Sequence, residues 1–301
     1  MSLFAIGLVL LSALTHAGWN LFGKKVSPGG AFFWHSTLWS ALLALPLIGL
    51  NIDGLARLST ETWWLVVLTG FFQAVYLSCL AAAYRHGELS IVYPLARSSP
   101  LLIVLFGSVF LGTAERISAW AVLGILLIVA GCIVLPMQHF RQLRWRNYQN
   151  LATLFALIAA AGTAGYSIVD DAATGLMREQ WPTPDADGDV ALVYVVLQAW
   201  SALAWLTLFL LPSSGERREL VSLFRYWRST ALTGVMIMAT YALVIWSMAY
   251  ADDVSYVVAF RQVSIPIGVA MGWHFLGESL YRPKIVGVVI ILLGLMMVVL
   301  G

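Results

Sequence analysis

The sequence is short of charged residues and of cysteine. Asp, Glu, Lys and Arg make up only 11% of its 301 residues, against about 25% in soluble globular domains. Their charges nearly cancel to a formal net charge of +2, so the chain offers no basic surface for nucleic acid. Its two cysteines, Cys79 and Cys132, fall inside apolar runs and provide neither a disulfide framework nor a metal-ligand spacing. A soluble enzyme and a nucleic-acid-binding protein are therefore excluded.

The chain is instead rich in apolar sequence, with 60% hydrophobic residues and a mean hydropathy of +0.86. A bilayer core of about 30 Å requires about 20 apolar residues per helix, and runs of that length follow one another along the whole chain. The sequence predicts an all-α polytopic membrane protein with ten transmembrane helices. The predicted spans are residues 3–22, 31–50, 63–84, 89–112, 118–136, 150–169, 190–212, 230–250, 254–276 and 284–300.

The two halves of the sequence resemble each other. HAGWNLF at residues 16–22 matches TAGYSIV at 163–169, and LARSSPL at 95–101 matches AFRQVSI at 259–265. Each half holds five predicted spans, so the second half enters the membrane upside down, as an inverted repeat. The predicted domains are a first repeat at 1–136, a basic linker loop at 137–149 and a second repeat at 150–301. Positions that recur with unchanged spacing are Glu115, Gly124 and Gly131, then Glu278, Gly287 and Gly294.

The basic residues predict the orientation in the membrane. The odd-numbered connections hold 12 of the 17 Lys and Arg residues, and the even-numbered connections hold 3. Cytoplasmic loops carry the excess of Lys and Arg. We therefore expect the odd-numbered connections to be cytoplasmic and both termini to lie on the outer side.

The ten spans, the AGWN and AGYS pair, the Leu-Ala-Arg segment and the FLG motifs followed by Glu resemble the drug/metabolite transporter superfamily, specifically its EamA-type permeases. The resemblance implies a secondary transporter of the bacterial inner (plasma) membrane, commonly an exporter of amino acids or other small metabolites. It also implies that spans 1, 3, 4, 6, 8 and 9 line a central cavity and that spans 5 and 10 are peripheral. The small multidrug branch carries a proton-coupling Glu in its first helix, whereas residues 3–22 contain no carboxylate.

Two arginines, Arg97 and Arg261, lie inside predicted spans at matching places in the two repeats. A guanidinium inside a membrane is costly and should face a cavity or a partner. The pair could clamp a carboxylate or phosphate, since each presents a planar fork of donors, or could only tie helices together. Prolines interrupt the same two spans and predict kinks there, namely Pro94, Pro100 and Pro266.

Polar side chains also form stripes on otherwise apolar helices. His16 and Asn20 share a face of the first span with Ser12, and Trp19 lies beside them. These residues could line a cavity, or could bond neighbouring helices, which is the preferred interpretation for Ser12 and Thr163. His16 could also carry a proton. Further candidates for substrate binding are Tyr166, Ser167, Gln73 and Tyr76, with Thr240, Tyr241 and Trp246 as weaker ones.

The carboxylates cluster near predicted helix ends, where most should be solvated or act as caps. Asp170 and Asp252 could instead bind a substrate amine or act as gate or coupling partners of an arginine. The sequence contains no HExxH, GxSxG or Walker motif. We therefore expect a transporter with no cofactor and no metal, acting on a small-molecule substrate in the lipid bilayer. A lipid flippase and a membrane-embedded enzyme are the alternatives, and the coupling ion and a monomeric or homodimeric state stay open.

Overall fold

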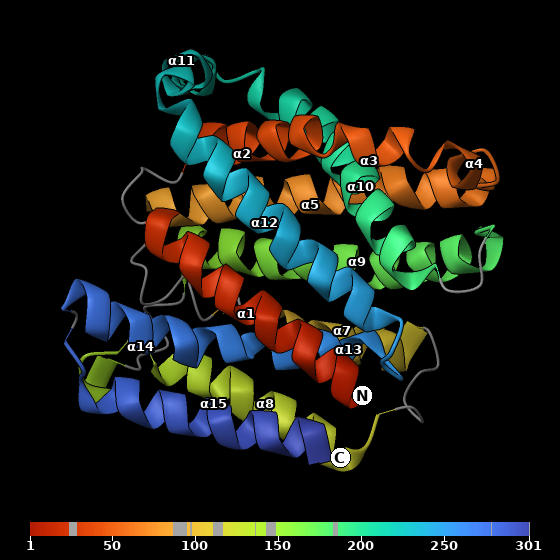
Figure 1. The fold of residues 1–301 in the computed structure, drawn as a ribbon. Helices are drawn as coiled ribbons and strands as arrows, with labels where there is room; N and C mark the ends of the chain where they lie inside the picture. Colours follow the sequence, from red (N-terminus) through yellow and green to blue (C-terminus); the bar gives the residue numbers. More distant parts are fainter. Residues whose placement is uncertain are drawn as a thin grey trace.

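The computed structural model describes residues 1–23, 29–86, 95–96, 98–110, 117–135, 137–142, 149–182, 186–277 and 279–300. All regular structure in these ranges is helical (Figure 1). The prediction of an all-α protein is therefore confirmed. The helices of the first half are α1 (Leu3–Gly23), α2 (Gly30–Leu43), α3 (Leu45–Gly49), α4 (Ile52–Leu55), α5 (Thr60–His86), α7 (Ser99–Phe110) and α8 (Ala119–Val134).

The second half continues the helical pattern. A short 3-10 turn, η2 (Phe140–Gln142), precedes it. Its helices are α9 (Leu151–Gln180), α10 (Asp187–Leu210), α11 (Ser214–Leu223), η4 (Phe224–Tyr226), α12 (Trp227–Met248), α13 (Val254–Phe260), η5 (Arg261–Val263), α14 (Ser264–Leu276) and α15 (Arg282–Leu300). Each of the ten predicted spans overlaps at least one of these helices.

Several helices have the length and composition of membrane spans. Among the described residues, five are long and apolar enough to cross a bilayer: Thr60–Ala83, Leu151–Gln180, Asp187–Leu210, Ser214–Met248 and Val254–Phe275. Two shorter apolar helices are Leu3–Gly18 and Ala119–Val134. Many large apolar side chains on the outer faces are exposed, as Leu14, Leu293 and Met296 are, and this suits a lipid environment. The chain is a multi-pass membrane protein.

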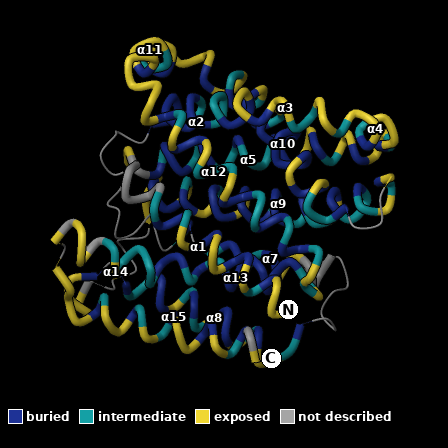
Figure 2. Tube along the Cα trace, viewed as in Figure 1, coloured by how far each residue is buried: buried dark blue, intermediate teal, exposed yellow. Residues whose placement is uncertain are grey.

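The helices form one bundle whose centre is buried and whose outer edges are exposed (Figure 2). Both termini lie at the same end of the bundle, and α11 lies at the opposite end (Figure 1). The packing is reciprocal between the halves: α1 packs on α12 as α9 packs on α5, and α2 packs on α12 as α10 packs on α5. Helices α8 and α15 pack on each other.

Glycines allow these close contacts. A Cβ atom built on Gly18 of α1 would lie 3.0 Å from Met236 on α12, and one built on Gly165 of α9 would lie 2.5 Å from Phe72 on α5. The shared glycine of the AGWN and AGYS motifs therefore has the same role in both halves. Between α8 and α15, a Cβ on Gly294 would lie 2.5 Å from the Gly124 carbonyl oxygen. The expected close approach through small residues is thus present.

Two helix boundaries differ from the prediction. Helix α9 continues to Gln180 instead of ending at residue 169, so Asp170 lies in the middle of a helix and not at its end. The predicted span at 31–50 is divided at Ala44 into α2 and α3, because Pro46 occupies the first turn of α3 and cannot continue the preceding helix. The connection at 213–229 is largely helical, as α11 and η4.

Candidate functional site

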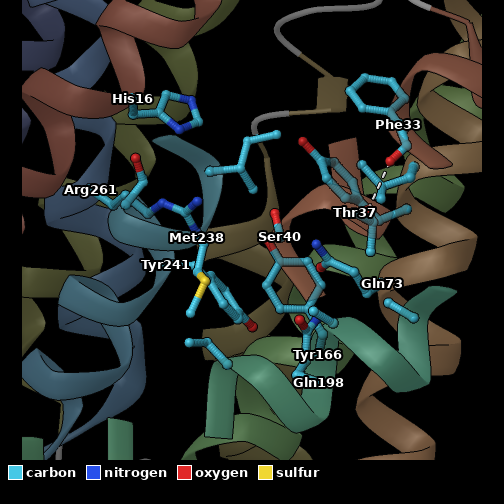
Figure 3. A pocket seen from close by; sticks show the side chains of 17 residues that line it. His16, Phe33, Thr37, Ser40, Gln73, Tyr166, Gln198, Met238, Tyr241 and Arg261 are labelled. Atoms are coloured by element: carbon cyan, nitrogen blue, oxygen red, sulfur yellow. Dashed lines mark hydrogen bonds between the residues drawn. The ribbon is translucent and has the colours of Figure 1, made fainter. Parts of the chain in front are cut away.

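A cavity lies inside the bundle between α1, α2, α5, α9, α10, α12 and η5 (Figure 3). The space between its lining atoms is about 770 Å³, and this value includes solvent at the opening. Its walls combine one guanidinium, one imidazole, two amides, several hydroxyls and an aromatic cluster. Within the part of the chain that the structure describes, no group of three or more His, Cys, Asp or Glu side chains could hold a metal ion.

Arg261 supplies the positive charge of the cavity. It is the first residue of η5, which separates α13 from α14, and Pro266 lies in the first turn of α14. The expected interruption at an intramembrane arginine is therefore present in the second half. Its Nε is buried and has no hydrogen-bond partner among the described residues. His16 of α1 lies on the same side of the cavity (Figure 3).

The opposite wall carries amides and hydroxyls (Figure 3). Thr37 donates to the Phe33 carbonyl at 2.8 Å, and Ser40 donates to the Gly234 carbonyl at 2.7 Å. These hydroxyls therefore use their hydrogens within the protein. The two amides do not: Oε1 of Gln73 and Nε2 of Gln198 are buried without a partner in the described part of the chain.

Three tyrosines form a continuous aromatic surface along the cavity. The ring centroids of Tyr76 and Tyr166 are 5.9 Å apart, and those of Tyr166 and Tyr241 are 6.0 Å apart, both in edge-to-face arrangements. Such arrangements are favourable for aromatic pairs. The rings come from α5, α9 and α12, so the surface joins helices of both halves. It offers apolar contact to a substrate beside the polar groups of the other walls.

Asp170 lies behind this aromatic surface and is fully buried. Its Oδ1 accepts hydrogen bonds from Thr69 at 2.5 Å and from Tyr194 at 2.6 Å, and its Oδ2 accepts one from Tyr241. Because Tyr241 also lines the cavity, a single hydroxyl connects the carboxylate to the site. The prediction that Asp170 sits near a helix end is wrong, because α9 continues to Gln180. Three partners from three other helices surround its carboxylate.

The structure brings together five of the predicted site residues. Arg261, His16, Gln73, Tyr76 and Tyr166 all line the cavity. Two of the weaker candidates, Thr240 and Tyr241, line it as well. Ser12 instead donates to the Thr240 carbonyl at 2.8 Å and ties α1 to α12, as expected.

Other predicted residues lie elsewhere. Ser167 is buried in α9. Neither Ser167 nor Trp246 lines the cavity. The carboxylate of Asp252 is 78% exposed and lies 3.2 Å from the N-terminal amine. Thr163 Oγ1, expected to bond a neighbouring helix, has no partner among the described residues. Arg97, Pro94, Glu115 and Glu278 lie outside the described residues, as do the side chains of Trp19 and Asn20.

Two helices contribute to the cavity that the resemblance did not assign to it. Predicted spans 2 and 7, now α2 and α10, supply lining residues, whereas the described residues of α7 supply none. Packing of α2 on α12 and of α10 on α5 and α2 brings both helices to the cavity wall. The lining residues that sequence reasoning missed are Phe33, Thr37, Ser40, Leu77, Val195, Gln198, Ala199, Ala202, Ile237 and Met238.

Comparisons with known proteins agree with this architecture. Residues 3–137 match the model of a family described as the EamA-like transporter family. A curated relative named riboflavin transporter, from Rhizobium johnstonii, is 26% identical over 284 residues, covering 93% of this chain and 82% of the relative. A solved crystal structure described only as that of a protein matches with a TM-score of 0.66 and 18% identity, covering 98% of this chain and 97% of that one.

These comparisons indicate the class of protein that the chain resembles. The family match confirms the resemblance to the EamA-type permeases of the drug/metabolite transporter superfamily. The solved structure shows a shared fold over nearly the whole chain. A multi-pass helical bundle, a polar and aromatic cavity inside it, and the family match together support a general role in membrane transport.

Proposed function

We propose that the protein is a secondary transporter that moves a small carboxylate-bearing metabolite, such as an amino acid, across the bacterial inner membrane. The observation that carries the proposal is the set of three buried, unpartnered polar groups in one cavity: Nε of Arg261, Oε1 of Gln73 and Nε2 of Gln198. Buried polar groups normally have hydrogen-bond partners. Two donors and one acceptor around an aromatic surface suit a small amphipathic solute that carries an acidic group.

Transport proceeds in this proposal by alternating access, with the two halves rocking about the cavity. The reciprocal packing of α1 on α12 and α9 on α5 supports a pseudo-two-fold relation between two inverted five-helix repeats. The family match over residues 3–137 covers the first of these repeats. The direction of export rests on the resemblance alone, and the outward position of both termini rests on the distribution of Lys and Arg.

Arg261 has the role of anion binder in this proposal, and Arg97 is its counterpart in the first repeat. The position of Arg261 in the cavity wall supports its role. The role of Arg97 is inferred from the matching place of the two arginines in the repeats. His16 and the three tyrosines would hold the remainder of the substrate.

Riboflavin is the second candidate substrate. The relative named riboflavin transporter favours it, and so does the tyrosine surface formed by Tyr76, Tyr166 and Tyr241. A flat ring system could pack on these tyrosines while its polar edge bonds the two amides. Riboflavin carries no carboxylate, so Arg261 would contribute less to its binding than to that of an amino acid.

Counterflow into proteoliposomes tests the proposal. The probes are radiolabelled amino acids, organic anions, organic cations and riboflavin, each tested with wild type, Arg261→Gln and Arg97→Gln. Arg178→Gln is the matched control, because Arg178 pairs with Asp187 at 3.9 Å and does not line the cavity. We expect exchange of an anionic or zwitterionic probe that is lost in Arg261→Gln and retained in Arg178→Gln.

The other outcomes separate the alternatives. Exchange of riboflavin with little effect of Arg261→Gln would favour the second candidate. Exchange of a permanent cation alone would contradict the proposed substrate class. If no soluble probe exchanges but fluorescent lipids move between the leaflets, the protein is a flippase, and the cavity is not a site for soluble metabolites.

A further inference from the structure

Asp170 has an environment that the proposed transport function leaves unexplained. The carboxylate and its partners Thr69 and Tyr194 are fully buried, and Tyr241 is 8% exposed. The four side chains come from α9, α5, α10 and α12. They therefore form a compact hydroxyl and carboxylate cluster at the junction of four helices, one layer behind the cavity.

The cluster contains a titratable group without a paired cation. Among the described residues, no Lys, Arg or His nitrogen lies within ion-pair distance of Asp170. The guanidinium of Arg261 interacts with it only at longer range. Ionisable residues inside a membrane are costly and commonly functional. An Asn or Ser could accept hydrogen bonds from these hydroxyls without that cost, so a purely structural tie does not account for an aspartate.

We propose that Asp170 binds and releases a proton during the transport cycle, and that Tyr241 passes its protonation state to the cavity. This inference rests on the proposed transport function and adds a coupling ion to it. Tyr241 is suited to the role because its hydroxyl bonds Asp170 while its ring lines the cavity beside Tyr166.

The donors and acceptors of the cluster explain how the signal passes. In the unprotonated state all three hydroxyls donate to the carboxylate, so the hydrogen of Tyr241 points away from the cavity. When a hydronium ion from the aqueous phase transfers a proton to Oδ2, that oxygen becomes a donor and the Tyr241 oxygen its acceptor. The hydrogen of Tyr241 must then turn towards another acceptor. One O–H bond of the hydronium ion breaks as the O–H bond of Asp170 forms, and the donor is left as water; release of the proton reverses this step.

This reversal couples the proton to the substrate. A substrate acceptor atom that takes the released Tyr241 hydrogen bond stabilises the protonated cluster. By thermodynamic reciprocity, the proton then stabilises the bound substrate to the same extent. Proton and substrate should therefore be bound together and move in the same direction, which under an inward proton gradient means uptake and not the export that the resemblance implies.

Few other titratable groups act on this cluster. Helices α5, α7, α10, α12 and α13 pack on α9. Of these, α10 and α12 present Tyr194 and Tyr241, and Arg261 follows directly after α13. The Tyr256 hydroxyl of α13 accepts a hydrogen bond from Ser118 instead. Helix α7 contains no ionisable residue, and α5 has its Asp, Glu, Lys and Arg residues only near its two ends.

Infrared difference spectroscopy between acidic and alkaline pH tests the proton site on the lipid-reconstituted full chain. The proton itself is the probe, so no substrate is needed. We expect a carboxylic acid band that disappears in Asp170→Asn and is retained in Asp53→Asn, a matched change at an exposed aspartate. Tyr241→Phe should shift the band, because it removes one hydrogen bond from the carboxyl. A difference spectrum that is the same in all variants would overturn the proposal. If Asp170→Asn does not fold, the presence or absence of the band shift in Tyr241→Phe decides between the two outcomes.

Transport driven by a pH gradient tests the coupling, with radiolabelled glutamate and riboflavin as probes. Wild type should accumulate the probe that it exchanges when the outside is more acidic. In Asp170→Asn this accumulation should be at least about tenfold lower than in wild type, while exchange of the probe remains measurable. Accumulation at the wild-type level in Asp170→Asn would overturn the coupling. If wild type exchanges neither probe, the proposed function fails for these substrates, and the infrared result still decides the proton site.

Discussion

Arg85, in the last turn of α5, forms an ion pair with Glu216 in the first turn of α11. The Glu216 carboxylate is buried and also accepts a hydrogen bond from the backbone N–H of Ala31 at the start of α2, at 3.1 Å. One carboxylate therefore joins the connection between α10 and α12 to two helices of the first half. His35 strengthens this attachment, since its Nε2 lies 2.7 Å from the Leu220 carbonyl oxygen.

Glu216→Ala should therefore destabilise the protein more than Arg85→Ala. Removing the carboxylate leaves the Ala31 N–H and the guanidinium without their partner, which costs about 1–3 kcal/mol. Arg85 is 50% exposed, and an exposed ion-pair partner contributes less because water replaces it. Thermal unfolding of the two purified variants in detergent measures the difference. Equal losses, or a larger loss in Arg85→Ala, would contradict this account of Glu216.

A second prediction concerns the contact between α8 and α15. A Cβ on Gly131 would lie 2.8 Å from the Gly287 carbonyl oxygen, and backbone atoms cannot move aside as side chains do. Gly131→Ala should therefore lower stability by about 1–3 kcal/mol through overpacking. The matched control is Gly7→Ala in α1, where nothing lies within 4 Å.

The control should be neutral or slightly stabilising, because Ala has the higher helix propensity by up to about 1 kcal/mol. Apparent melting temperatures in detergent compare the two variants. A loss in Gly7→Ala as large as that in Gly131→Ala would show that the close approach of α8 and α15 is not the cause.

Much of the fold could be predicted because the bilayer constrains the sequence strongly. Apolar runs of about 20 residues mark helices, and the recurring glycines mark where helices meet. The end of α9 could not be predicted from hydropathy, since Asp170 and the residues after it look like a polar loop. Tertiary partners override that signal: Thr69, Tyr194 and Tyr241 satisfy the carboxylate inside the bundle.

The site was predictable only where polarity contrasts with the surroundings. Arg261, His16 and Gln73 stand out because polar groups in apolar helices need partners. Gln198 carries the same signal, being the one amide or charged residue in the predicted span at 190–212, and could have been found. Phe33 and Met238 give no such signal, because an apolar side chain suits lipid, a helix contact or a cavity equally well.

The two cavity amides lead to a third prediction. Gln198→Leu should raise the half-saturation concentration of the exchanged probe about tenfold, the effect of losing a hydrogen bond of about 1.4 kcal/mol. Gln73→Leu should act similarly from the other amide. Gln262→Leu is the control, because this buried amide neighbours Arg261 but does not line the cavity. Equal effects of Gln198→Leu and Gln262→Leu on half-saturation would show that these amides act on folding and not on binding.

The orientation of the bundle gives the fourth prediction. Arg57 and Arg218 are exposed and lie at opposite ends of the bundle, near α4 and on α11 (Figure 1). If the connections rich in Lys and Arg are cytoplasmic, a cysteine at position 57 should face the outer side and one at position 218 the cytoplasm. We therefore expect Arg57→Cys to react with a membrane-impermeant maleimide in intact cells, and Arg218→Cys to react only after permeabilisation.

The labelling experiment requires a background without the native thiols. Cys132 is buried and Cys79 is partly buried, so replacing both with Ser changes no exposed surface of the two connections. Labelling of position 218 alone in intact cells would reverse the orientation. Labelling of both positions from outside would contradict more than the orientation, because two ends of one membrane-spanning bundle cannot both face the same side.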